Sequence, residues 1–146
     1  MVAAVPLSRL LLAVGACPLV LGVAACGGSS DSTTKVLFPR GCAKPSYKPT
    51  QIIVTCGDAN TVVQKISWKS YGEMSAEGSG TAAVNACDPN CADGKFEKFP
   101  ATVALSKPKD CGKGVTQFTS LVMTYTGAKP GSTGSQISEE FPCNGP

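Results

Sequence analysis

The sequence contains no histidine, and this absence excludes several kinds of active site. The usual serine and cysteine triads need a histidine as general base, so the chain cannot form them. Zinc sites often combine cysteine with histidine, and here only Cys87 and Cys91 are spaced closely enough to act as a ligand pair. We therefore assign no catalytic, cofactor-binding or metal-binding residues, and we do not expect an enzyme.

Clustered positive charge is missing as well. The chain carries 13 lysines and arginines against 10 acidic residues, and its lysines are scattered without a run or interleaved aromatic residues. Nucleic-acid-binding domains usually have a clustered basic footprint. We therefore predict that the chain does not bind nucleic acid.

The N-terminal apolar run is too short for a permanent membrane span. Arg9 precedes 16 uncharged residues, Leu10–Ala25, whereas a spanning helix needs about 20 apolar residues. A basic start, a short apolar core and an exit of small residues are typical of a removable signal peptide. We predict such a signal peptide over residues 1–25.

Cys26 follows this run directly. The segment Val23–Cys26 resembles the lipobox of bacterial lipoproteins, in which the signal peptide is cut before the cysteine and its thiol is diacylated, for example with palmitate. The resemblance implies a lipid anchor on Cys26 and a protein held on the extracytoplasmic face of the cell membrane, since two acyl chains anchor stably. The glycine- and serine-rich residues that follow predict a flexible tether, so that residues 26–41 comprise the anchor and its tether. The alternative is a soluble secreted protein cut at an ordinary signal-peptidase site.

Six cysteines remain once Cys17 leaves with the signal peptide and Cys26 is modified. They are Cys42, Cys56, Cys87, Cys91, Cys111 and Cys143. An even number of cysteines in an exported chain predicts disulfides, and six allow about 15 pairings. Cys87 and Cys91 are near enough in sequence to close a tight turn. The simplest arrangement without nesting then pairs Cys42 with Cys56 and Cys111 with Cys143.

Helical patterning is absent after the signal peptide. No window carries apolar residues at helical spacing without an interrupting glycine or proline. Instead, short β-rich segments lie between turn residues, which is typical of strands. The predicted strands are 50–56, 62–68, 77–85, 99–106 and 116–126.

Apolar and polar residues alternate along the last two of these segments. In 99–106, for example, Ala101, Val103 and Leu105 share one face. Such alternation favours antiparallel strands with one solvated face over a parallel sheet, whose strands are apolar throughout. We predict an all-β fold for residues 42–146, a small disulfide-stapled antiparallel β-sandwich or partly open barrel.

Two aromatic residues lie at or near the end of the second predicted strand. Trp68 is in phase with Ile66 on the apolar face, so we expect it in the core. Tyr71 lies just beyond the strand and is expected to be exposed, where its ring could stack on a flat ligand. Tyr71 and two residues of the preceding turn, Asp58 and Asn60, are our candidate ligand contacts.

Glycine, proline, asparagine and aspartate mark the predicted turns. We expect an Asx-type turn at 57–60, tight turns within 88–94, a longer loop at 106–114 and a loose tail at 128–136. Gly78 and Gly80 are expected to mark a bulge or bend.

The pattern Asp88-x-Asn90-x-x-Asp93 only faintly resembles a calcium loop because its third acid comes one place late. We predict a polar turn closed by a disulfide there.

Several motifs are familiar in combination. They are Cys56–Asn60, Ile66–Trp68 with Tyr71-Gly72, Ala76–Thr81, Asn85–Gly94 and Val103–Leu105. Together they resemble a family of small secreted proteins and lipoproteins of actinobacteria, over Pro49 to Pro108. The resemblance implies export and a compact domain, and the family has no assigned activity. The chain departs from it at Tyr71, where tryptophan is frequent, and at Phe96-Glu97, where histidine is common.

Compartment and composition favour a non-catalytic role. We predict a lipid-anchored module that binds another envelope protein, a polysaccharide or a lipid, without a cofactor. One alternative is a secreted hydrolase that holds two carboxylates about 5–10 Å apart across an envelope polysaccharide. Its candidate acids are Asp58, Glu73, Glu77, Asp93 and Glu97. Another alternative is an inhibitor-like module whose loop at Cys87–Gly94 occupies a partner's cleft.

Overall fold

The computed structural model describes residues 34–39, 44–131 and 133–143. They belong to a compact unit that spans Ser32–Pro146. The predicted signal peptide, Cys26 and Cys42 lie outside the described residues, so what we expect of them stays a prediction. Within the described ranges, no helix has the length and apolar character needed to cross a membrane.

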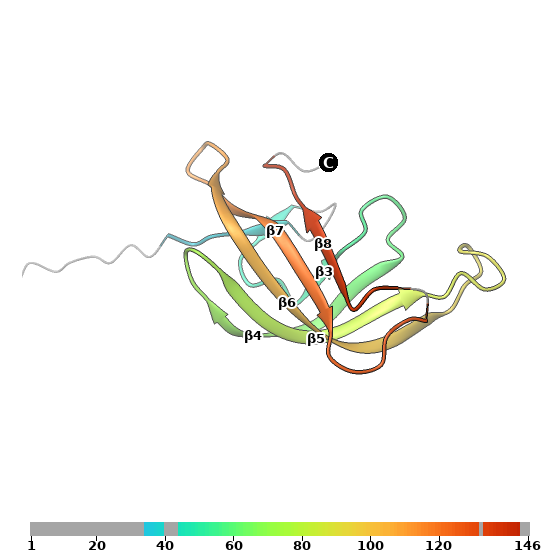
Figure 1. Cartoon of the computed structure of the whole chain (residues 1–146). Helices are drawn as coiled ribbons and strands as arrows, with labels where there is room; N and C mark the ends of the chain where they lie inside the picture. Colours follow the sequence, from blue (N-terminus) through green and yellow to red (C-terminus); the bar gives the residue numbers. More distant parts are fainter. Residues whose placement is uncertain (1–33, 40–43, 132, 144–146) are drawn as a thin grey trace, which may run out of the picture. The chain divides into compact units, whose positions relative to one another are not determined.

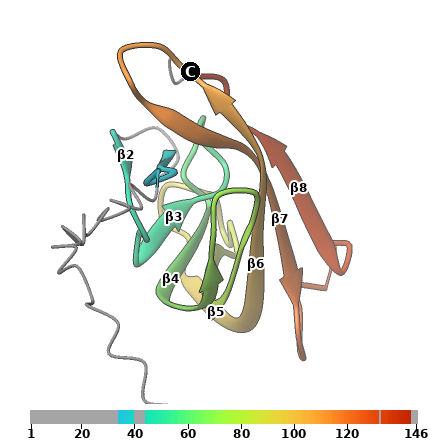
Figure 2. The same cartoon turned by 90° about the vertical axis from the view of Figure 1, so that its left-hand side faces the viewer.

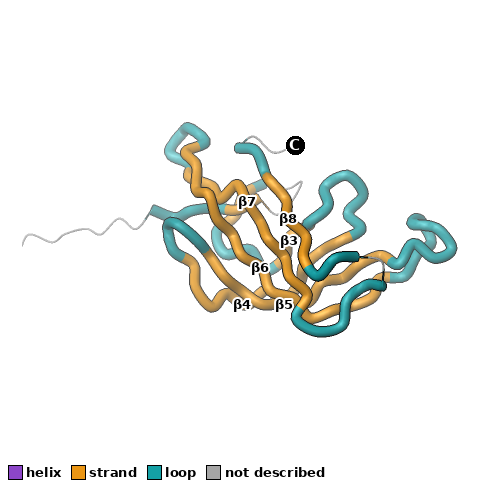
Figure 3. The backbone as a smooth tube through the Cα atoms, viewed as in Figure 1, coloured by secondary structure: helices purple, strands orange, loops and turns teal. Residues whose placement is uncertain are grey.

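The described ranges contain strands and no helix. The strands are β1 (Phe38–Pro39), β2 (Pro45–Ser46), β3 (Gln51–Ile53), β4 (Thr61–Tyr71), β5 (Ala76–Asn85), β6 (Phe96–Asp110), β7 (Thr116–Tyr125) and β8 (Gln136–Glu140). Strands β3 to β8 form one antiparallel sheet in chain order, and β1 pairs with β2. Figure 3 shows turns and loops joining successive strands. The prediction of an all-β antiparallel fold is confirmed.

The six-stranded sheet curls into a half-barrel (Figures 1 and 2). Its β4–β5 register shifts between Gln64 and Ser67, which marks a bulge, and bulges bend a strand. Opposite the bulge, a Cβ added to Gly80 would lie 2.7 Å from the carbonyl oxygen of Gln64, and one on Gly78 would lie 2.9 Å from that of Ser67. Only glycine allows this approach, so Gly78 and Gly80 mark a bulge, as predicted, although the extra residues of the bulge are in β4.

The apolar core lies on one face of the curled sheet. Along β6, Ala101, Val103 and Leu105 are buried, whereas the residues between them are at least partly accessible. Along β7, Leu121 and Met123 repeat this pattern. Because side chains of a strand alternate between its two faces, the intervening residues share the solvated face.

The segment around β1 is part of the same domain. Leu37 pairs in parallel with Gln117 of β7. Phe38 is fully buried, and its ring centroid lies 5.1 Å from that of Phe141. Val36 is buried as well. The packed domain therefore includes residues before the predicted boundary at residue 42.

Two regions predicted as irregular contain strand residues. Strand β6 continues through Pro108 to Asp110, so the predicted loop at 106–114 is wrong and the connection to β7 is a short turn. Strand β8 begins at Gln136, where a loose tail was expected to end. Both segments pair with β7. Pairing with β7, whose side chains are largely buried, outweighs the weak strand propensity of their lysine, proline and glutamate residues.

Candidate functional site

The three candidate ligand contacts lie at opposite ends of β4. Asp58 and Asn60 precede the strand, and Tyr71 is its last residue. At about 3.3 Å per residue, this strand of 11 residues separates them by about 30 Å. They therefore do not form a single site.

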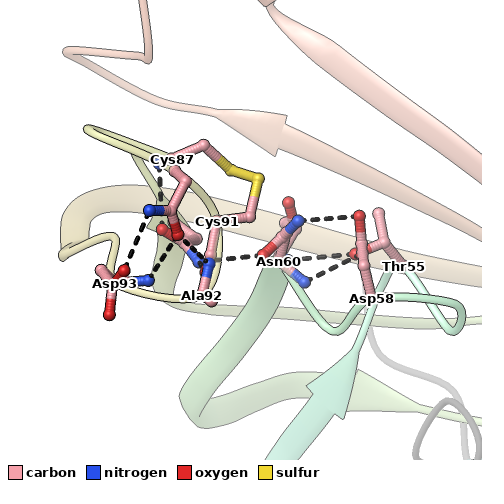
Figure 4. The surroundings of a disulfide bond; sticks show 10 residues. Thr55, Asp58, Asn60, Cys87, Cys91, Ala92 and Asp93 are labelled. Atoms are coloured by element: carbon pink, nitrogen blue, oxygen red, sulfur yellow. Dashed lines mark hydrogen bonds between the residues drawn. A yellow bond between two sulfur atoms is a disulfide. The ribbon is translucent and has the colours of Figure 1, made fainter.

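Asp58 and Asn60 hold a turn together. The backbone N–H of Asn60 donates to Asp58 Oδ1 at 3.0 Å, and the Asn60 side-chain amide donates to Asp58 Oδ2 at 2.8 Å. These bonds, with the backbone bond contributing most and the Thr55 side chain next, lower the pKa of Asp58. The predicted Asx turn is confirmed. Asn60 Oδ1 in turn accepts a hydrogen bond from Asn85 Nδ2 at 3.0 Å (Figure 4).

The loop after β5 is closed by the predicted disulfide, Cys87–Cys91. Asn85 braces it, because its Oδ1 accepts from the Cys87 N–H at 3.0 Å while its Nδ2 donates to the Cys91 carbonyl at 2.8 Å. A Cβ on Gly94 would overlap Asn85 Oδ1, so this position needs glycine. Figure 1 shows the loop extending beyond the strands, opposite the β4–β5 turn. We call Asp58–Asn60 and residues 85–95 the loop end.

Polar groups at the tip of this loop bond to one another. Asn90 Oδ1 accepts from the backbone N–H groups of Ala92 and Asp93, and its Nδ2 donates to Asp93 Oδ2 at 2.9 Å. This is the predicted polar turn closed by a disulfide. Among the described residues, no group of three or more histidine, cysteine, aspartate or glutamate side chains is arranged to hold a metal ion.

A second disulfide joins Cys111 in the β6–β7 turn to Cys143 near the C-terminus, as predicted. Cys56 is partly buried and packs against the core. Because its expected partner Cys42 lies outside the described residues, the pairing of these two cysteines stays a prediction.

Tyr71 stands in an aromatic cluster at the other end of β4. Its ring centroid lies 4.9 Å from that of Trp68 and 5.1 Å from that of Tyr47, both edge to face. The fully buried Phe118 ring is 5.7 Å away. The expectation that Tyr71 is exposed is wrong, because this packing leaves it half-buried. Burial raises the pKa of Tyr71 to about 12, so it stays neutral at physiological pH.

Trp68, which was predicted in the core, packs against it and is partly buried. Its indole N–H donates to the Pro49 carbonyl at 3.0 Å, and its ring meets Tyr71. The indole is thus engaged within the domain, which argues against a role as an open stacking platform for ligands.

A groove crosses the solvated face of β5, β6 and β7. It has a volume of about 350 Å³, which is within the range of small-ligand sites. In register across the sheet, Ser79 pairs with Thr102 and Thr102 with Thr124, so three hydroxyl residues form a row along its lining. Lys69 and Glu77 add one charge of each sign.

The groove provides a single carboxyl group, Glu77, among its lining residues. The other candidate acids lie outside this lining: Asp58 and Asp93 belong to the loop end, Glu73 to the β4–β5 turn and Glu97 to β6. Hydrolysis by a carboxylate pair needs two such groups in one cleft. The groove is therefore better suited to hydrogen bonding than to this chemistry.

Sequence reasoning did not identify the groove. The alternation along each strand indicated that Thr102 and Thr124 face solvent, but only the register of three strands places them beside Ser79. That register depends on the lengths of the β5–β6 and β6–β7 connections, which sequence patterns predict poorly.

Comparison with known protein families, with curated proteins and with solved structures gives no match for this chain.

Proposed function

We propose that the chain is an exported, lipid-anchored protein of the cell envelope whose β domain binds a polar ligand without catalysis. The predicted signal peptide and the lipobox-like segment ending at Cys26 support export and anchoring. The disulfides Cys87–Cys91 and Cys111–Cys143 support a location outside the reducing cytosol.

The anchor is tested by Cys26→Ser, with Cys17→Ser in the signal peptide as the matched control. We expect the Cys26 variant to leave the membrane fraction while its domain stays folded, because the acceptor of the acyl chains is gone. The control should remain in the membrane fraction. Fractionation after a high-salt wash and mass spectrometry of the mature N-terminus measure this. Retention of the Cys26 variant, or an unacylated N-terminus in the natural chain, would contradict the anchor.

The hydroxyl row of Ser79, Thr102 and Thr124 is the observation that carries the binding proposal. Each hydroxyl can donate and accept a hydrogen bond, which suits a ligand with many hydroxyl groups. One lysine and one glutamate leave the groove with little net charge. A neutral envelope polysaccharide has this chemistry, so we propose it as the ligand class.

The double variant Thr102→Val/Thr124→Val tests the groove, because it keeps side-chain shape and removes two hydroxyls. Each lost hydrogen bond contributes about 0.5–1.5 kcal/mol, so we expect binding to purified envelope polysaccharide to weaken about tenfold. Thr126→Val is the control, since Thr126 is exposed and lies outside the groove lining. Co-sedimentation with the polysaccharide gives the affinities. Equal binding by both variants would refute the groove as the binding site.

An inhibitor-like role is a second candidate, favoured by the loop between β5 and β6. Residues from Ala86 to Lys95 extend beyond the strands (Figure 1), and a disulfide and the bonds of Asn85 and Asn90 brace them. A rigid exposed loop loses little entropy when it enters a cleft. If the loop inhibits an envelope hydrolase, Cys87→Ser/Cys91→Ser should weaken inhibition while the groove variants leave it unchanged.

A further inference from the structure

The described chain begins beside the β4–β5 turn. The backbone N–H of Thr34 donates to Glu73 Oε1 in that turn at 3.1 Å. Two cation–π contacts lie here as well, because the side chains of Lys35 and Lys48 both approach the ring of Tyr47. We call Thr34, Lys35, Tyr47, Lys48 and the turn Gly72–Ser75 the entry end.

The entry end exposes large apolar side chains. Met74 at the tip of the turn is 73% exposed and Tyr47 is 41% exposed. Phe96, which is 51% exposed, lies near the other end of the sheet, where it pairs with Asn85. Isolated exposed apolar residues are common. Here, however, two of them share the side of the domain on which the chain enters.

Positive charge accompanies these apolar groups. The ammonium of Lys35 lies 5.8 Å and that of Lys48 5.3 Å from the Tyr47 ring centroid, and Lys48 is also 5.9 Å from the Tyr71 ring. The Glu73 carboxylate is the acidic group in the turn and accepts the bond from Thr34. Tyrosine and lysine combine an apolar body with a polar end, which suits the boundary between lipid and water.

The short stretch of chain between Cys26 and Thr34 also favours contact between the entry end and the membrane. Cys26 and Thr34 are eight residues apart in the sequence, and a chain of that length spans at most about 29 Å. An anchored Cys26 therefore holds the entry end near the bilayer. The loop end lies about 30 Å further along β4, because the strand rises about 3.3 Å per residue.

We propose that Lys35, Tyr47, Lys48 and Met74 form a lipid-facing patch that seats the entry end on an anionic membrane surface. This inference rests on the proposed anchor, which converts a weak surface contact into an intramolecular one. Each lysine near an anionic surface strengthens binding about fivefold. The seated domain presents the loop end and its disulfide to the surrounding medium.

In the test, a hexahistidine tag takes the place of Cys26 at the N-terminus of the mature chain. The tag binds to vesicles that contain a nickel-chelating lipid. This arrangement holds the domain at the bilayer whether or not Cys26 is acylated in the cell, so failure of the patch and failure of the anchor are distinguished. Met74→Trp reports contact with lipid, and Phe96→Trp is the matched control at the other end of the sheet. Both replace an exposed apolar residue. The signal of Trp68 is subtracted with the unsubstituted chain.

On vesicles of phosphatidylcholine with about one third phosphatidylglycerol, brominated lipid should quench the Met74→Trp signal at least twofold more than the Phe96→Trp signal. Lys35→Ala/Lys48→Ala in the Met74→Trp background should remove most of this difference, as should phosphatidylcholine alone. Equal quenching at both positions, or none at Met74→Trp, would overturn the proposal. A difference that persists in Lys35→Ala/Lys48→Ala, or on phosphatidylcholine alone, would also overturn it, because the tether and not the patch would then hold the entry end at the lipid.

Discussion

The loop end and the entry end of the domain are stabilised by different kinds of interaction. At the loop end, Asn60, Asn85 and Asn90 form hydrogen bonds around the Cys87–Cys91 disulfide. Near the entry end, aromatic rings pack edge to face from the exposed Tyr47 inward to the buried Phe118. The loop end is therefore held by polar contacts and a covalent cross-link, whereas the region near the entry end is held by apolar packing.

Position relative to the core explains this difference. The loop extends beyond the strands (Figure 1) and has little apolar surface to bury, so its polar groups pair with one another and a cross-link limits its unfolded states. Tyr71 lies at the end of β4 but still reaches Phe118 in the core. The loop end thus has its polar groups occupied, whereas the entry end keeps apolar and cationic groups available for contact.

The largest expected effect is on the free energy of unfolding, when a phenylalanine near each end of the sheet is replaced by alanine. Phe118→Ala removes a fully buried ring and should lower the free energy of unfolding by about 3–5 kcal/mol. Phe96→Ala is the matched control, since its ring is 51% exposed, and it should change this energy by less than about 0.5 kcal/mol. Urea denaturation followed by the fluorescence of Trp68 measures both. Similar losses for the two variants would show that Phe96 is part of the packed structure.

The two disulfides should differ in the same experiment. Cys111–Cys143 links residues 32 apart in the sequence and Cys87–Cys91 residues 4 apart. If a cross-link acts mainly on the unfolded chain, replacing both cysteines by serine should cost about 4 kcal/mol for the first pair and about 2 kcal/mol for the second.

Hydrogen exchange sharpens this comparison. Loss of Cys87–Cys91 should increase exchange only in the loop between β5 and β6, because the hydrogen bond from Asn85, the last residue of β5, to Asn60 remains. Loss of Cys111–Cys143 should increase exchange in the β6–β7 turn and near the C-terminus. Equal destabilisation and equally widespread exchange in both variants would contradict the chain-entropy explanation.

The sequence predicted the fold class and most of the sheet because strand alternation is a local signal. Segments such as 99–106 alternate strictly, and the structure buries the expected residues there. The predicted strands missed β8 and both ends of β6, where lysine, proline and glutamate hide the pattern. These segments are strands because β7 lies beside them, and that is a property of the assembled sheet.

The candidate site was less predictable than the fold. Asp58 and Asn60 were correctly placed in an Asx turn, since the bonds of such a turn are formed within a few residues. Tyr71 was expected in solvent because it follows a strand, but its burial depends on Tyr47 and Phe118, which are distant in sequence. The hydroxyl row of the groove depends on the register of three strands in the same way.

The smallest expected effect concerns Tyr71. Its pKa is raised to about 12 in the folded domain, against about 10 in an unfolded chain. The stabilising contribution of the neutral phenol is therefore fully present below about pH 10 and is lost as the pH rises toward 12, because the unfolded chain releases this proton first. Tyr71→Phe removes the titrating group, so its urea midpoint should fall less than that of the natural chain between pH 9 and 11.5.

Near pH 7 the same substitution should change stability little, because the buried hydroxyl makes no hydrogen bond of standard geometry to another described residue. Some alkaline loss should persist in Tyr71→Phe, since burial also raises the pKa of Tyr125. The double variant Tyr71→Phe/Tyr125→Phe should then be the least sensitive to alkaline pH. Parallel curves for the natural chain and both variants would contradict this explanation, because they would mean that neither phenol is desolvated in the folded domain.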